Sequence, residues 1–152
     1  MDLDQIEPNL FVGSCPRDAD DVERLRSDHG VTAVLNVQTD EDMDIWGIDW
    51  HQMQRVYEGT GIVVRHEPVR DYDMEALRQR LPACVRTLEE LCNEGHIVYI
   101  HCTAGINRSP TTVIAYLHRC QNWELGDAMN HVLQCRVCKP FLQPIVAADW
   151  SA

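Results

Sequence analysis

One segment constrains this chain more than any other, because it runs from an apolar strand through a short loop into a helix. Residues 97–100 are apolar and have strand character, and Pro110 fits the first turn of a helix, where its missing N–H group costs nothing. In the loop between them, successive backbone N–H groups converge on one point, and the helix N-terminus adds the positive end of its dipole. The segment therefore predicts a binding site for a phosphate-like anion.

Three side chains of this segment suit the chemistry of a bound phosphate. Cys102 lies at the floor of the predicted cup, where the amides that favour phosphate also favour a thiolate, the nucleophilic form of cysteine. Arg108 offers a planar guanidinium to two phosphate oxygens, and Ser109 can hydrogen-bond the sulfur when it must leave again. A buried structural thiol is the alternative for Cys102, but that role would not explain Gly, Arg and Ser at these offsets. We expect a cysteine that attacks phosphorus.

The other residues of the loop are expected to support this reaction. His101 should brace the loop by a hydrogen bond and not act as a base, because a thiolate needs none. Gly105 allows the backbone to approach the ligand closely, and Asn107 tolerates a positive φ if the loop requires one. The predicted substrate-binding residues of the loop are Thr103, Ala104, Gly105, Ile106 and Asn107.

A second loop is expected to supply an acid, because the alcohol that leaves phosphorus needs a proton. Residues 68–73 join a predicted strand to a predicted helix and contain Asp71 and Asp73. Their spacing does not decide which of them reacts. We favour Asp71 as the acid, with Asp73 as the N-cap of the following helix.

Apolar runs rich in β-branched residues alternate with stretches of helical spacing along the chain. Strands are expected at residues 10–13, 31–37, 61–65 and 97–100. Helices are expected at residues 19–27, 49–57, 74–93, 110–119 and 125–134, after which Pro140 and Pro144 break the pattern. The alternation predicts one α/β domain over residues 1–152, with helices on both faces of a central sheet and a strand order that the sequence leaves open.

The charge of the chain restricts its partners. The sequence has 24 aspartates and glutamates against 13 lysines and arginines, a net charge of −11, which argues against nucleic acid or an anionic membrane as the main partner. No apolar run reaches the length of a membrane span, and the first residues are too acidic for a signal peptide. The odd set of 7 cysteines favours a reducing compartment, with the cytoplasm as the expected one.

The segment His101-Cys102, followed by five residues and then Arg108-Ser109, together with the upstream aspartate loop, resembles the dual-specificity branch of the protein tyrosine phosphatase superfamily. Within that branch the chain looks like the catalytic domain of plant glucan phosphatases of the starch-excess and laforin type. The motifs that carry this likeness are Val12-Gly13-Ser14-Cys15, Trp46-Gly47-Ile48-Asp49, Arg70-Asp71-Tyr72-Asp73, Leu77-Arg78 with Leu81-Pro82, and His101-Cys102-Thr103-Ala104-Gly105.

The resemblance covers nearly the whole chain and implies a protein tyrosine phosphatase-like fold. It also implies that Cys102 is the nucleophile, Arg108 the phosphate ligand, Asp71 the general acid and then base, and Tyr72 a contact to sugar. The implied reaction passes through a phosphocysteine and needs neither a metal nor an organic cofactor. Asn107 departs from these enzymes, which usually carry glycine at that position.

Aromatic residues near the acid loop are candidates for sugar contacts, because glucose rings stack on aromatic faces. Trp46, Trp50 and Tyr72 are considered for such a wall, with burial in the core as the alternative for each tryptophan.

Three functions follow as hypotheses. A phosphatase of phosphorylated glucan is favoured, and a phosphatase of phosphotyrosine and phosphoserine/threonine proteins is the alternative. A phosphate-binding module without turnover is the third, and the presence of both the cysteine and the acid argues against it. The sequence does not determine the oligomeric state.

Overall fold

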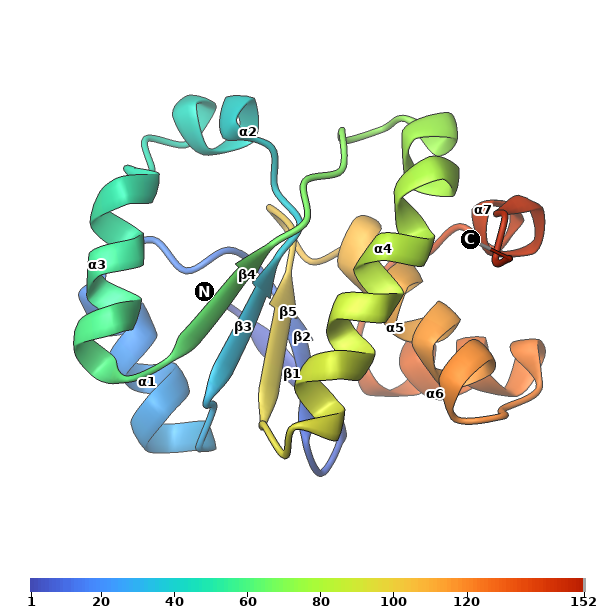
Figure 1. Ribbon diagram of the computed structural model, residues 1–152, viewed down its shortest axis with the longest axis horizontal. Helices are drawn as coiled ribbons and strands as arrows, with labels where there is room; N and C mark the ends of the chain where they lie inside the picture. Colours follow the sequence, from blue (N-terminus) through green and yellow to red (C-terminus); the bar gives the residue numbers. More distant parts are fainter. Residues whose placement is uncertain (152) are drawn as a thin grey trace.

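Five short strands form one sheet at the centre of the molecule (Figure 1). This computed structural model describes residues 1–151. The strands are β1 (Leu3–Glu7), β2 (Leu10–Gly13), β3 (Ala33–Asn36), β4 (Val63–His66) and β5 (Val98–His101), in the order β1-β2-β5-β3-β4. β1 pairs with β2 in the antiparallel direction, and the other three pairs are parallel. The parallel strands therefore all end at the same edge of the sheet, with β5 in the middle.

Helices cover both faces of the sheet, as the sequence predicted (Figure 1). On one side lie α1 (Ala19–His29), α2 (Asp40–Ile45) and α3 (Trp50–Thr60), and on the other α4 (Met74–Asn93), α5 (Arg108–Cys120), α6 (Leu125–Cys135) and α7 (Gln143–Ala147). The fold is α/β. Among residues 1–151, no helix combines the length and the apolar character that a membrane span requires.

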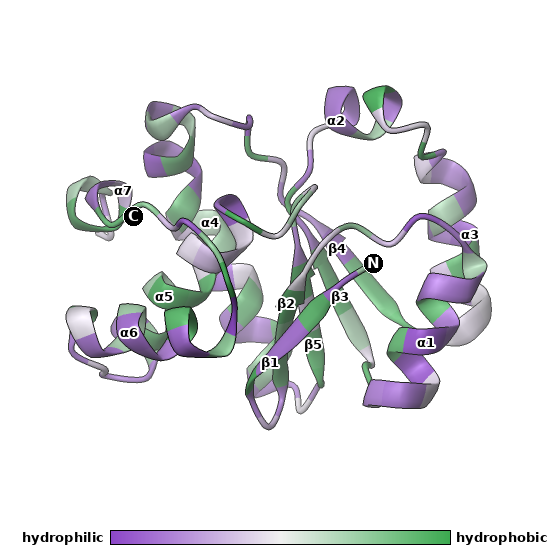
Figure 2. Ribbon diagram, turned by 180° about the vertical axis from the view of Figure 1, so that it is seen from behind, coloured by the Kyte–Doolittle hydropathy of each residue, from purple (hydrophilic) through white to green (hydrophobic). Residues whose placement is uncertain are grey.

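Successive strand residues point to opposite faces of the sheet, and so build two separate cores. Val34 packs in the cluster beneath α1 and α3, whereas its neighbour Leu35 packs in the cluster beneath α4, α5 and α6. Tyr99 and Ile100 divide in the same way. Because both faces are covered, the inner strands are hydrophobic almost throughout, whereas α1 consists largely of hydrophilic residues (Figure 2).

Strong hydrophobic patterns predicted their elements well, and weak ones did not. β2 and α4 have the expected bounds. The sequence did not predict β1, in which Ile6 is the one buried residue of five. It did not predict α2 either, because Met43 is the one buried residue of that helix. The helix expected at residue 110 begins two residues earlier, at Arg108. Pro144, which was expected to break the helical pattern, lies in the first turn of a further short helix, α7.

Candidate active site

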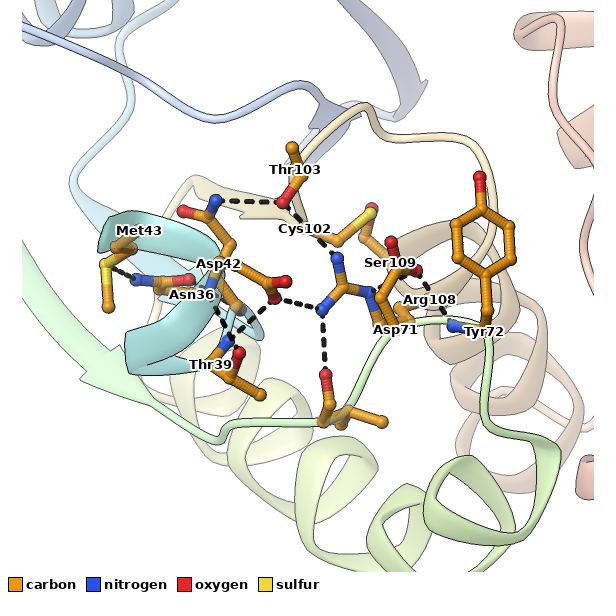
Figure 3. A network of polar contacts seen from close by, with 12 residues as sticks. Asn36, Thr39, Asp42, Met43, Asp71, Tyr72, Cys102, Thr103, Arg108 and Ser109 are labelled. Atoms are coloured by element: carbon orange, nitrogen blue, oxygen red, sulfur yellow. Dashed lines mark hydrogen bonds and ion pairs between the residues drawn. The ribbon is translucent and has the colours of Figure 1, made fainter. Parts of the chain in front are cut away.

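Cys102 lies where the central strand β5 ends, at the start of the loop 102–107 that leads into α5 (Figure 3). It is only 3% exposed, and its Sγ atom lies 3.2 Å from the hydroxyl oxygen of Ser109 in the first turn of α5. The strand, the loop and the helix thus bring the expected nucleophile and the expected hydroxyl partner into contact.

The carbonyl groups of residues 103–106 all accept hydrogen bonds from outside the loop. The donors are the N–H group of Cys15, the guanidinium of Arg136 and the N–H group of Lys139, at distances between 2.7 and 3.1 Å. In a planar trans peptide the C=O and N–H groups point in opposite directions. The N–H groups of residues 104–107 therefore point away from these donors, and within the described residues none of the four donates to a protein oxygen. Four adjacent free donors suit an oxyanion.

Gly105 has the left-handed backbone that the loop needs, whereas Asn107 does not. Gly105 has a φ of +70°, and a Cβ atom there would lie 2.4 Å from the carbonyl carbon of Gly13. Asn107 has a φ of −123°, so its tolerance of positive φ is not used. Its side-chain amide instead donates to the carbonyl of Lys139 at 2.8 Å, which ties the loop to the C-terminal segment.

Arg108 is buried beside Cys102, with 2% of its surface exposed. One terminal nitrogen donates to Asp42 Oδ2 at 2.6 Å and to the carbonyl of Val69 at 2.8 Å, and the other donates to the hydroxyl of Thr103 at 3.3 Å. Its Nε atom lies 3.2 Å from Asp71 Oδ1 but is not aligned for a hydrogen bond. Figure 3 shows the guanidinium between Asp42 and Asp71. These contacts fix its plane before any ligand arrives.

Asp42 was missed by the sequence analysis, although its helix start has a recognisable pattern. Thr39 and Asp42 form a capping box at the start of α2. Burial alone would raise the pKa of Asp42, but hydrogen bonds from Arg108 and from the Thr39 amide hold that pKa below its ordinary value. Asp42 therefore stays ionised and offsets part of the charge of Arg108.

The two aspartates of the acid loop have different surroundings. Asp73 is the N-cap of α4 and accepts a hydrogen bond from the amide of Ala76 at 2.9 Å. The Asp71 carboxylate faces Arg108 and lines the same cleft as Cys102. Tyr72 between them has a φ of +53°, which is uncommon for a bulky residue and turns the chain sharply at this point. The N-cap prediction for Asp73 is confirmed.

His101 is buried and makes one hydrogen bond, which Nδ1 donates to the carbonyl of Cys102 at 2.9 Å. Burial lowers its pKa to about 4, so the ring is neutral near neutral pH. Its ring stacks on Tyr99, with centroids 5.8 Å apart. Nε2 has no partner within residues 1–151. These surroundings suit the bracing role expected for His101.

A cleft of about 490 Å³ opens above Cys102 and Arg108. Trp46 and Tyr72, 50% and 87% exposed, stand at its rim. The other residues that line it are Asp71, Thr103, Ala104, Ile106, Asn107, Lys139 and Phe141. Of the loop residues expected to bind substrate, only Gly105 does not line the cleft.

Trp50 does not belong to this cleft. It lines a separate open hollow of about 1130 Å³ beside α2 and α3, and its ring packs 5.1 Å from that of His66. Phe141 occurs in the wall where a third aromatic residue was expected. Neither Phe141 nor Arg136 carried a sequence signal, because both reach the loop from a C-terminal segment without a motif of its own.

Comparison with known proteins agrees with this geometry. The family described as dual specificity phosphatase, catalytic domain, matches residues 10–142. Over 99% of its own length, this chain is 36% identical to phosphoglucan phosphatase LSF1, chloroplastic, of Arabidopsis thaliana. Over 90% of its own length, it is 36% identical to laforin of Mus musculus. It spans only 25% and 44% of those two proteins.

A solved structure shows the same fold at lower sequence identity. The crystal structure of PTPMT1 superposes with a TM-score of 0.76 and 20% identity, covering 95% of this chain and 90% of that one. The sheet, the cysteine loop and the family match lead to one conclusion: this chain belongs to the dual-specificity phosphatases.

Proposed function

We propose that the chain hydrolyses phosphate monoesters through a phosphocysteine at Cys102, and that its substrate is a phosphorylated glucan. One observation carries the chemistry: the Cys102 sulfur lies in a cup with four free amide donors and a buried guanidinium. Such a cup favours both the thiolate and the phosphate. Donors fixed in advance also stabilise the charge that develops on the oxygens of phosphorus in the transition state.

In the first step, the Cys102 sulfur forms a bond to phosphorus while the bond from phosphorus to the alcohol oxygen breaks. Asp71 gives its proton to that oxygen, and Arg108 with the loop amides holds the three remaining oxygens. In the second step, water attacks phosphorus, Asp71 takes a proton from the water, and the bond between sulfur and phosphorus breaks. The hydroxyl of Ser109, 3.2 Å from the sulfur, stabilises the departing thiolate.

The glucan substrate is supported by the rim of the cleft and by the relatives. Trp46, Tyr72 and Phe141 present aromatic surface beside the cup, where the sugar that carries the phosphate would lie. LSF1 is named a phosphoglucan phosphatase. A phosphoprotein substrate is the alternative, since the family as a whole is described as dual specificity phosphatase.

The experiment compares phosphate release from phosphorylated amylopectin, a panel of phosphopeptides and an aryl phosphate, with Cys102→Ser as the control. We expect glucan to be the best polymeric substrate and the control to be inactive on all three. A glucan rate no better than the peptide rates would overturn the substrate assignment. Full activity of Cys102→Ser would overturn the mechanism.

A reducing compartment is part of this proposal, because the reaction needs Cys102 as a thiolate and all seven cysteines, which lie within the described residues, are free. The cytoplasmic location expected from the sequence is not confirmed, because LSF1 is named as chloroplastic.

A further inference from the structure

Arg136 is the C-cap residue that follows α6, and it is almost completely buried although its side chain is charged. Its Nε atom donates to the carbonyl of Gly105 at 2.7 Å, and one terminal nitrogen donates to the carbonyl of Ala104 at 3.1 Å. The guanidinium thus donates hydrogen bonds to the carbonyl groups of two successive peptides of the cysteine loop.

These two hydrogen bonds determine the direction of two backbone N–H groups. The carbonyl of residue 104 and the N–H group of residue 105 belong to one planar peptide and face opposite ways, as do the carbonyl of residue 105 and the N–H group of residue 106. Holding both carbonyls toward Arg136 therefore aims the amides of Gly105 and Ile106 toward the cup. The other two loop carbonyls are held by backbone N–H groups, so Arg136 is the one side chain in this set of donors.

The guanidinium is itself held by two carboxylates from the start of the chain. One terminal nitrogen donates to Asp4 Oδ2 at 2.9 Å, on the edge strand β1, and the other to Asp2 Oδ1 at 2.5 Å. Two carboxylates against one guanidinium leave the trio with a net negative charge. Arg136 therefore adds little positive potential to the cup, and its effect on the cup comes from geometry.

We propose that Arg136 is a positioning residue for catalysis, which sets the direction of two phosphate-binding amides, and that Asp2 and Asp4 keep it in place. The N-terminal strand then belongs to the support of the active site, although none of its side chains lines the cleft. This inference rests on the proposed function, because it assumes that the loop binds phosphate oxygens.

The test replaces Arg136 by Met, which keeps an unbranched apolar side chain but removes the guanidinium, and by Lys, which keeps the charge. The readouts are kcat and KM for 4-nitrophenyl phosphate and the Kd of inorganic tungstate, measured well below the unfolding temperature of each variant. Loss of one oxyanion donor lowers kcat by about 100- to 1000-fold. Here two donors are misdirected and not removed, so we expect kcat for Arg136→Met to fall about 10- to 100-fold.

Tungstate should bind Arg136→Met more weakly by a similar factor, and Arg136→Lys should lie between Met and wild type, because one ammonium cannot reproduce the planar fork. Arg119→Met is the matched control. Its guanidinium stacks on Trp150, 4.9 Å away and outside the loop, so kcat and tungstate affinity should not change.

A folded Arg136→Met variant with wild-type kcat and tungstate affinity would overturn the proposal. If that variant does not fold, the double variant Asp2→Asn with Asp4→Asn decides, because it leaves Arg136 in place but loosened. We expect weaker tungstate binding and a lower kcat there too, although the trio then carries a net positive charge that by itself favours an anion. Unchanged or improved values would overturn the inference. A wild-type protein without aryl phosphatase activity would refute the proposed function instead, while the tungstate comparison would still test the role of Arg136.

Discussion

Gly105 shows how strictly the loop restricts a single residue. Its φ of +70° is unfavourable for any residue with a Cβ atom, and that atom would also lie 2.5 Å from the carbonyl oxygen of Gly13. Replacement by Ala must move either the loop or strand β2. We expect Gly105→Ala to lower kcat/KM for 4-nitrophenyl phosphate by at least about 100-fold, because the loop amides lose their aim.

Gly95→Ala is the matched control for this change. Gly95 has a φ of +89° but no atom within 4 Å of the position of a new Cβ. The Gly95→Ala variant should therefore keep its activity. Its free energy of unfolding should fall by about 1 kcal/mol, because a residue with a Cβ atom disfavours the left-handed backbone. Equal activities of the two variants would contradict the packing argument for Gly105.

His101 gives the protein a defined dependence of stability on pH. Burial lowers its pKa to about 4, below the ordinary value of about 6.5. The unfolded state therefore binds the proton first, and the stability that the neutral ring provides is complete above about pH 6.5 and is lost progressively as the pH falls toward 4. We expect the free energy of unfolding in urea to fall by roughly 3 kcal/mol across this window because of His101.

His101→Gln should remove this part of the pH dependence, whereas His51→Gln, at an exposed position on α3, should leave it unchanged. The slope of stability against pH is the readout, because any loss of packing in His101→Gln affects all pH values alike. An unchanged slope in His101→Gln would show that the buried ring does not titrate as described.

Among the elements, helix α2 is linked to the active site through one residue, Asp42. The carboxylate of Asp42 caps the helix and also accepts a hydrogen bond from Arg108 at 2.6 Å. Hydrogen bonds to charged groups contribute about 1.5–3 kcal/mol. If Arg108 loses its orientation in Asp42→Asn, we expect kcat/KM for aryl phosphate to fall by about 10-fold or more.

Asp42 should also make the stability of the wild-type protein depend on pH, and Asp42→Asn should lack this dependence. The pKa of Asp42 is lowered in the folded state, so its stabilising effect is complete above the ordinary value of about 3.9 and disappears as the pH falls through the lower folded value. The difference in unfolding free energy between wild type and Asp42→Asn should therefore be constant near neutral pH and shrink in acid. Asp44→Asn, on the same helix, is the control: the side chains that contact Arg108 are those of Asp42, Asp71 and Thr103, so this variant should keep its activity.

The contrast between β5 and β1 explains how much of the fold could be predicted. β5 is buried on both faces, so its run of apolar residues is unambiguous, and the loop after it follows from residue chemistry. β1 lies at the edge of the sheet with one buried residue in five, and its pairing depends on β2 and not on its own pattern. Contacts such as that of Arg136 with residues 2 and 4 join the two ends of the chain, and no local pattern indicates them.

Across the whole molecule, the site is assembled where the parallel strands end, from segments far apart in sequence (Figure 1). The loop after β5 supplies Cys102, the connection after β4 supplies Asp71, and the end of α2 supplies Trp46. Two parts of this site have separate tasks in the proposed function. Cys102, Arg108 and the loop amides bind and cleave the phosphate, which every substrate has. The aromatic rim contacts the group that carries the phosphate.

This division makes a prediction about substrates of different size. Each aromatic contact is worth about 0.5–1.5 kcal/mol, so Trp46→Ala and Tyr72→Ala should each reduce kcat/KM on phosphorylated amylopectin by about 2- to 10-fold. Neither should change kcat on 4-nitrophenyl phosphate, because the cup is untouched. Trp50→Ala, in the neighbouring hollow, should not distinguish the two substrates. Equal losses on both substrates would mean that the rim aligns the acid loop or the cysteine loop, whereas a selective loss on the glucan would identify it as the surface that the sugar contacts.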